Sequence, residues 1–188
     1  MAEEKGKIII ISGPSGVGKS TICEEVLKRS NTYLSVSVTT RPKSAGEQDG
    51  REYFFISPEK FEKLINENGL LEYAEVFGYM YGTPKDKTEQ ELSQGKAVIL
   101  EIDVQGAKKV KKLYPDAKLI FILPPAQRDL VERLKKRGRD EDTVVERRLS
   151  GAGMEIAAAW EYFEYMVIND DLAQAVDEVV EIIEEIGA

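Results

Sequence analysis

The sequence predicts an α/β fold, in which a parallel sheet flanked by helices carries an inserted lobe and a helical lid. Short apolar runs typical of buried strands, at residues 8–11, 97–102 and 118–123, alternate with helical patterns. Between residues 34 and 84 this alternation gives way to short strands and tight turns, which indicates the inserted lobe. An arginine-rich helical stretch at residues 128–159 indicates the lid.

Local signals place the elements in order along the chain. The isoleucines at 8–11 predict a buried strand, and Ser57-Pro58 predicts a helix start, because proline suits the first helical position. Apolar residues of the last helix recur at helical spacing, which is typical of core packing. Strands are expected at 7–12, 33–38, 53–56, 71–77, 79–81, 97–102, 118–123 and 166–168, and helices at 19–30, 58–66, 84–95, 105–113, 127–136, 143–162 and 172–186.

The length of 188 residues suggests a single domain, residues 1–188, rather than two. We expect its core at residues 1–33, 85–127 and 160–188, the inserted lobe at 34–84 and the lid at 128–159.

Composition argues against several classes of function. The net charge of −8 argues against a nucleic-acid partner, and no apolar run approaches the roughly 18 residues of a membrane span. Without any histidine, catalytic triads and most zinc sites are excluded. The one cysteine, Cys23, is expected to be a small buried helix residue. A single cysteine and an N-terminus without signal-sequence features both fit a reducing cytoplasm. An acidic surface of this kind leaves monomer and homodimer open.

Residues 13–20 read G-P-S-G-V-G-K-S directly after the first apolar run, which is a phosphate-binding loop of the G-x-x-x-x-G-K-[ST] type. Backbone N–H groups of such a loop surround a polyphosphate, and the positive end of the next helix attracts it. We expect Lys19 to reach the β- and γ-phosphates and the Ser20 hydroxyl to bind Mg²⁺. A plain glycine-rich turn would not need this Lys-Ser pair. The expected ATP-binding residues here are Gly13, Pro14, Ser15, Gly16, Val17, Gly18, Lys19, Ser20 and Thr21.

The loop alone does not separate kinases from ATPases or GTPases, but three further segments narrow the function. They are residues 35–41 with 46–53, residues 72–75 with 81–83, and residues 100–106. With them, essentially the whole chain resembles guanylate kinase, the nucleoside monophosphate kinase of P-loop NTPase fold that transfers a phosphoryl group from ATP to GMP. The resemblance implies Mg²⁺ as cofactor, ATP and GMP or dGMP as substrates, a GMP-binding inserted lobe and a place in cytoplasmic purine metabolism.

The resemblance also assigns the acceptor site. One carboxylate such as Glu72 can accept hydrogen bonds from both N1–H and N2–H of guanine, whereas adenine lacks the 2-amino donor. Two alternatives stay open, in which Tyr53 and Tyr81 are simply packed aromatics and Thr83 is a helix N-cap. Matching positions that hydrogen-bond guanine are Ser37, Glu72, Thr83 and Glu101, and those that hold the GMP phosphate are Arg41, Tyr53 and Tyr81.

Catalytic roles follow from the same resemblance. Lys19, Arg41, Arg137 and Arg148 are the expected catalytic residues, the last two being lid arginines that close over the phosphates. Arg147 and Arg148 are adjacent on a helix, so at most one faces the phosphates. Asp103, at the end of a buried strand, is expected to orient Mg²⁺ through water. Asn169 and Asp170 match positions beside the adenine of ATP.

Two other functions remain open from the sequence. A guanylate-kinase-like interaction module would bind a partner protein, although such modules usually lack an intact phosphate-binding loop. A kinase of the same fold for another phosphorylated acceptor would not need Ser37, Glu72, Thr83 and Glu101 together.

The family pattern usually places a second phosphate-binding arginine three residues after Arg41, where this chain has Ser44. Lys43 lacks the planar fork of arginine, so GMP binding is expected to be weaker than in a relative with both arginines. We predict that Ser44→Arg tightens GMP about tenfold, or ~1.4 kcal/mol, measured as KM for GMP. An unchanged KM would contradict this prediction.

Overall fold

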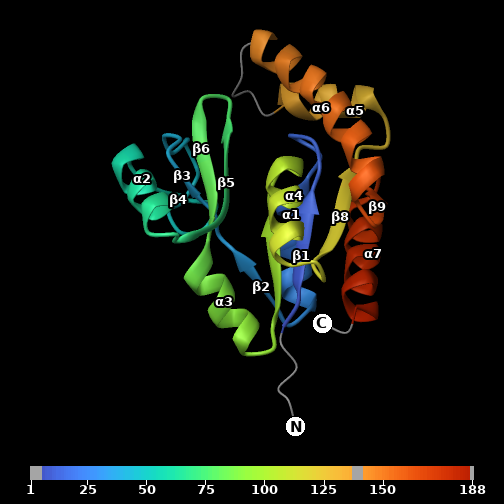
Figure 1. Ribbon diagram of the computed structural model, residues 1–188. Helices are drawn as coiled ribbons and strands as arrows, with labels where there is room; N and C mark the ends of the chain where they lie inside the picture. Colours follow the sequence, from blue (N-terminus) through green and yellow to red (C-terminus); the bar gives the residue numbers. More distant parts are fainter. Residues whose placement is uncertain (1–5, 137–141, 187–188) are drawn as a thin grey trace.

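The computed structural model describes residues 6–136 and 142–186, and the described part contains a large and a small sheet (Figure 1). All pairings in the large sheet are parallel, as expected for the core of an α/β fold. Its strands, in spatial order, are β2 (Thr32–Ser35), β7 (Ala97–Glu101), β1 (Ile8–Ser12), β8 (Lys118–Leu123) and β9 (Tyr165–Ile168).

Helices cover both faces of this sheet. Successive side chains of β1 point to opposite faces, so each face contributes its own set of residues to the packing. Ile9 and Ile11 pack against α1 (Lys19–Arg29) and α7 (Leu172–Glu185). Ile8 and Ile10 face the other core cluster, which includes residues of α3 (Lys85–Ser93), α4 (Val104–Leu113) and the end of α6 (Asp142–Tyr162). All four isoleucines are at most 3% exposed. Burial on both faces explains why β1 reads as a continuous apolar run.

The small sheet and α2 (Pro58–Asn66) form a lobe beside the core, and α5 (Gln127–Lys136) and α6, the helices of the expected lid, lie across the upper end of the core in Figure 1. The strands of the small sheet, in spatial order, are β4 (Phe54–Phe55), β3 (Val38–Thr39), β6 (Tyr79–Pro84) and β5 (Leu70–Val76). β3 pairs parallel with β4, whereas β6 pairs antiparallel with β3 and β5. Proline follows the N-cap Ser57 of α2, whose side chain accepts from the Lys60 amide, as the sequence predicts.

The predicted α/β class and the elements along the chain are confirmed, with one instructive difference. The expected strand at 33–38 is divided, because the chain changes partners within it. Ser35 pairs with Leu100 in the large sheet, whereas Val38 pairs with Gly82 in the small one. A change of partner leaves no trace in a local apolar pattern. Cys23 is fully buried in α1, as predicted.

None of the helices in the described residues combines the length and the apolar character needed to cross a bilayer.

Candidate functional site

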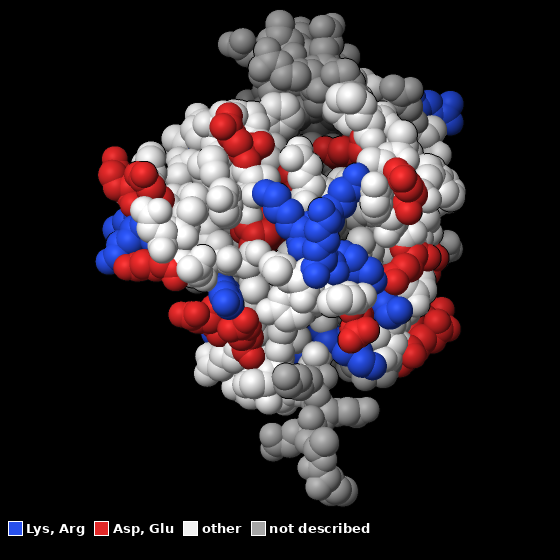
Figure 2. Space-filling model, viewed as in Figure 1, with Lys and Arg blue, Asp and Glu red and all other residues white. Residues whose placement is uncertain are grey.

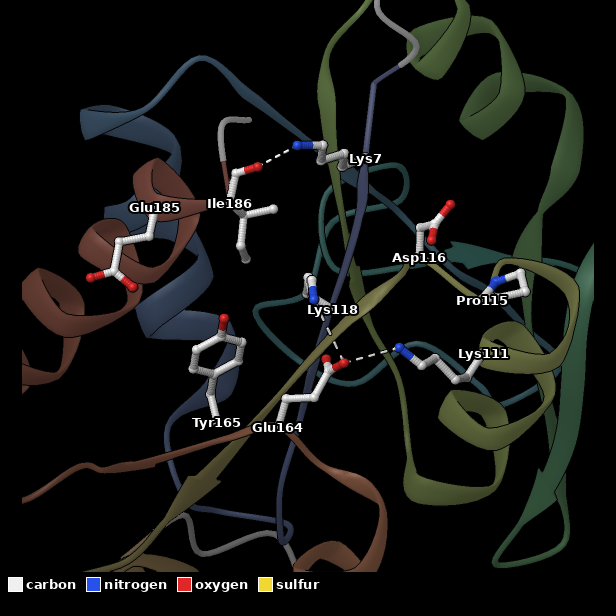
Figure 3. Close-up of a pocket in the computed structure, with 9 residues that line it drawn as sticks. All are labelled: Lys7, Lys111, Pro115, Asp116, Lys118, Glu164, Tyr165, Glu185 and Ile186. Carbon is white, nitrogen blue, oxygen red and sulfur yellow. Dashed lines mark hydrogen bonds and ion pairs between the residues drawn. The ribbon is translucent and has the colours of Figure 1, made fainter.

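A cavity of about 1450 Å³ lies between the carboxyl ends of the core strands and the small sheet. In parallel α/β sheets, ligands bind at this end of the strands. Another cavity, of about 530 Å³, lies at the opposite end of the sheet (Figure 3). There Glu164 lies 3.1 Å from the ammonium of Lys111 and 3.7 Å from that of Lys118. Since its lysines are engaged within the protein, the larger cleft is the candidate site.

Most residues expected from the sequence line this cleft, although from several separate segments. Of the expected ATP-binding residues, Pro14, Val17, Thr21 and Asn169 do not line it, and neither does Thr83 of the acceptor set. The expected residues that do line it are Gly13, Ser15, Gly16, Gly18, Lys19, Ser20, Ser37, Arg41, Tyr53, Glu72, Tyr81, Glu101 and Asp103.

The phosphate-binding loop joins β1 to α1 and holds its lysine close to the loop backbone. The Lys19 ammonium donates to the carbonyls of Gly13, at 2.6 Å, and Pro14, at 3.2 Å. Gly18 has a φ of 105°, and a Cβ there would lie 2.5 Å from the Asn169 amide nitrogen. Both facts require glycine at this position.

Asn169 lies behind the loop rather than in the cleft. Its side-chain amide donates to the Val17 carbonyl at 2.8 Å, and the residue is only 6% exposed. Arg133 of α5 donates to the same carbonyl at 3.1 Å and to the Asn169 carbonyl at 2.9 Å. The place of Asn169 beside the adenine of ATP stays a prediction. Sequence reasoning missed Arg133, whose only signal was its place one turn after the buried Leu130.

Glu101 faces the phosphate-binding loop. The parallel register of β1 and β7 pairs Ile11 with Glu101, so the carboxylate lies beside the start of α1. The Ser20 hydroxyl donates to it at 2.8 Å. A hydroxyl and a carboxylate are the hard oxygen ligands that suit Mg²⁺. No cluster of three or more metal-binding side chains occurs among the described residues, so phosphate and water would have to supply most ligands.

Asp103 faces the acceptor half of the cleft. Its carboxylate caps α4 by accepting from the Gly106 amide at 2.7 Å. Its negative charge also contributes to the raised pKa of Glu72, which places the two carboxylates near each other. Glu101 thus lies beside Ser20 and Asp103 near Glu72, whereas the resemblance assigned Glu101 to guanine and Asp103 to Mg²⁺.

The Glu72 carboxylate is buried in the acceptor half. It accepts a hydrogen bond from the Thr83 hydroxyl at 2.7 Å, and the two residues are 7% and 0% exposed. Burial raises the pKa of Glu72 to about 7, opposed by the Thr83 hydrogen bond and reinforced by Asp103. Pro84 occupies the N-cap of α3 without a side-chain hydrogen bond, so the alternative of Thr83 as N-cap is wrong.

Arg41 sits in an aromatic and polar enclosure at the outer part of the lobe. Its guanidinium carbon lies 5.6 Å from the ring centroid of Tyr53, which packs edge-on against Tyr81 with centroids 5.6 Å apart. One guanidinium nitrogen donates to the Ser44 hydroxyl at 2.9 Å and the other to Glu47 at 2.8 Å. Glu47 lies in the segment 46–53 that the sequence singles out, although no role was assigned to it there.

The positions of the two expected lid arginines relative to the phosphate-binding loop are not described. Arg137 lies outside the described residues, and the Arg148 side chain lies outside those described on α6. Glu155 of α6 lines the cleft, and burial raises its pKa, while the charge of Lys19 lowers it. The sequence carried no motif that would have singled out Glu155.

Comparison with known proteins gives a consistent result. The family model described as guanylate kinase matches residues 5–186. A guanylate kinase of Synechocystis sp. is 48% identical over 182 residues, covering 96% of this chain and 95% of that protein. One of Carboxydothermus hydrogenoformans is 47% identical over 93% of this chain and 86% of its own length. The crystal structure of guanylate kinase from Anaplasma phagocytophilum aligns with a TM-score of 0.83 and 33% identity over 98% of this chain and 88% of that one.

We predict that Glu72→Gln stabilises the nucleotide-free protein at pH 8 but not at pH 4.5. Folding raises the pKa of Glu72 from 4.5 to about 7, so the folded chain binds more protons than the unfolded chain between these values. Wild-type stability therefore falls as the pH rises through this window, by up to about 3 kcal/mol, and glutamine removes that loss.

Urea denaturation at the two pH values measures this difference. Glu75→Gln, on the exposed face of the same strand, is the matched control. A gain in the free energy of unfolding that is equal at both pH values would contradict the prediction.

Proposed function

The chain belongs to the guanylate kinase family, and we propose from this premise how each part of the cleft serves the reaction. The enzyme transfers the γ-phosphoryl group of ATP to GMP, giving ADP and GDP. The single observation that carries the assignment of parts is the placement of the phosphate-binding loop and the buried Glu72–Thr83 pair on two sides of one cleft. ATP would bind along the loop, and GMP in the lobe of residues 34–84.

Guanine recognition is proposed for Glu72, with Thr83, Ser37 and Asp103 around it. The Thr83 hydroxyl occupies one side of one carboxylate oxygen and leaves acceptor capacity toward the cleft. N1–H and N2–H of guanine match this capacity, whereas adenine would leave the buried carboxylate short of donors, at a cost of ~1–3 kcal/mol. These contacts involve only the base, so dGMP is expected to be accepted as well.

The GMP phosphate is proposed to bind Arg41, with Tyr53 and Tyr81. The Arg41 guanidinium already donates hydrogen bonds to the Glu47 carboxylate, at 2.8 Å, and to the Ser44 hydroxyl. A phosphate would share or replace these acceptors on the guanidinium fork. The Ser44 hydroxyl is neutral, so it does not supply the second positive charge of the family pattern.

Transfer itself relies on positioning and charge rather than on a covalent intermediate. Lys19 is held at the loop and is proposed to move from the Gly13 and Pro14 carbonyls to the β- and γ-phosphates. Arg137 and Arg148, from the lid at 128–159, are proposed to neutralise the transferring group, as arginine fingers do. Closing the lid and lobe would exclude water and limit hydrolysis of ATP.

Mg²⁺ is proposed as the cofactor, held by Ser20 with Glu101 acting directly or through water. When bound, Mg²⁺ offsets the charge of the phosphates during transfer. The Ser20 hydroxyl donates its proton to Glu101 at 2.8 Å in this structure, which leaves the lone pairs of the hydroxyl oxygen available to a metal.

The cellular setting is also proposed. A single buried Cys23 supports a reducing compartment such as the cytoplasm, and the substrates support a role in purine nucleotide metabolism. Free nucleotides would be the partners, rather than nucleic acid or a membrane, and monomer and homodimer stay open.

An assay of ADP release with GMP, dGMP, AMP, CMP and UMP as acceptors tests these assignments. We expect turnover with GMP and dGMP only, and near-complete loss in Lys19→Ala with GMP binding largely kept, because the ammonium acts on the phosphates of ATP. Lys28→Ala, on the exposed part of the same helix, is the control.

Normal turnover in Lys19→Ala would contradict the role of the loop. Turnover with other acceptors, or none with a folded protein, would favour the other-acceptor kinase or the interaction module.

A further inference from the structure

Helix α4 carries Lys108, Lys109, Lys111 and Lys112 in a protein of net charge −8. Figure 2 shows basic side chains gathered at the centre of the face on which α4 lies, with acidic ones around them. The lysines contact different parts of the fold rather than forming one site. The Lys108 ammonium lies 3.7 Å from the Tyr162 ring centroid, and Lys111 pairs with Glu164.

Lys109 differs from these because it joins the core to the acceptor lobe. Its ammonium donates to the Tyr73 carbonyl of β5 and lies 5.2 Å from the centroid of the Tyr73 ring. The backbone of β5 is therefore tied to α4 at the residue directly after Glu72. Side chains alternate along a strand, so the exposed Tyr73 and the buried Glu72 point to opposite sides.

The same face of α4 encloses the Glu72 carboxylate. Gly106, three residues before Lys109, has no room for a side chain, because a Cβ there would lie 2.8 Å from a Glu72 carboxylate oxygen. Residues three apart on a helix are neighbours, so Gly106 and Lys109 act on adjacent points of β5. Because Gly106 has no side chain, Glu72 can lie close to α4, and the hydrogen bond from Lys109 to Tyr73 keeps β5 at that distance.

Charge reinforces this arrangement. The charged groups that act on Glu72 are Asp103, which disfavours the carboxylate form, and Lys109, which favours it. Thr83 adds its hydroxyl from β6. The charge of Lys109 therefore lowers the pKa of Glu72, whereas burial and the charge of Asp103 raise it.

We propose that Lys109 is a positioning residue for guanine recognition, which pins β5 to α4 at Tyr73 and so holds the Glu72 carboxyl group in place against Gly106. The proposal rests on the proposed role of Glu72 in binding guanine. It adds to that role a residue that lies on a core helix and does not line the cleft.

The test compares Lys109→Met, Lys109→Arg and the control Lys112→Met, which is exposed on the same helix. KM for GMP, KM for ATP, kcat and the pH profile of kcat/KM for GMP are measured for each. In Lys109→Met we expect KM for GMP to rise about fivefold to tenfold, as for loss of a charge-assisted hydrogen bond, with KM for ATP and kcat within twofold. The acid limb of the profile should move to higher pH, because the carboxylate loses its positive neighbour. Lys109→Arg should keep KM for GMP and the pH profile close to those of the wild type.

A KM for GMP equal to wild type in Lys109→Met would overturn the proposal. So would a rise in both KM values with lower kcat and an unmoved acid limb, since this is what general loosening of the lobe would give. If circular dichroism shows Lys109→Met to be unfolded, Lys109→Gln takes its place with the same expectations.

Glu72→Gln, assayed in parallel, separates this inference from the proposed function. An unchanged KM for GMP in Glu72→Gln would remove the guanine assignment itself. A large rise there, together with wild-type behaviour of Lys109→Met, would overturn the role of Lys109 alone.

Discussion

The parallel pairing of β1 with β7 determines where both halves of the cleft lie. Its register sets Ile11 beside Glu101, so the loop that follows β1 and the carboxylate that ends β7 meet at one edge of the sheet. From that edge α4 starts at its N-cap Asp103, and Gly106 on the same helix receives Glu72 from the lobe. The pairing of β1 with β7 thus sets the position of the phosphate-binding loop directly, and it sets the position of Glu72 by way of α4.

The cleft keeps a buried carboxylate at some expense of stability. Glu72 has a hydroxyl partner in Thr83 but a raised pKa, so its charged form is disfavoured in the nucleotide-free protein. A site that recognises donors on a base needs such unused acceptor capacity, and the same capacity gives its selectivity. In its proposed role, Glu72 is therefore held in a state that only the correct acceptor satisfies fully.

The sequence was sufficient for the element order, the phosphate-binding loop and most cleft residues, because these depend on local patterns and a family motif. It was not sufficient for contacts made by packing. Glu101 and Asp103 are only two positions apart, yet Glu101 lies beside Ser20 and Asp103 near Glu72, because the chain turns from β7 into α4 between them. Asn169 and Arg133 support the loop through the Val17 carbonyl, a backbone group that no side-chain pattern reveals.

The measurement that tests the central claim most directly is Mn²⁺ affinity by electron paramagnetic resonance, with a non-hydrolysable ATP analogue bound. The register places Glu101, rather than Asp103, beside Ser20. The account predicts that Glu101→Gln weakens Mn²⁺ binding by about tenfold or more, whereas Asp103→Asn leaves it within about twofold. Weakening by Asp103→Asn with no change in Glu101→Gln would contradict it.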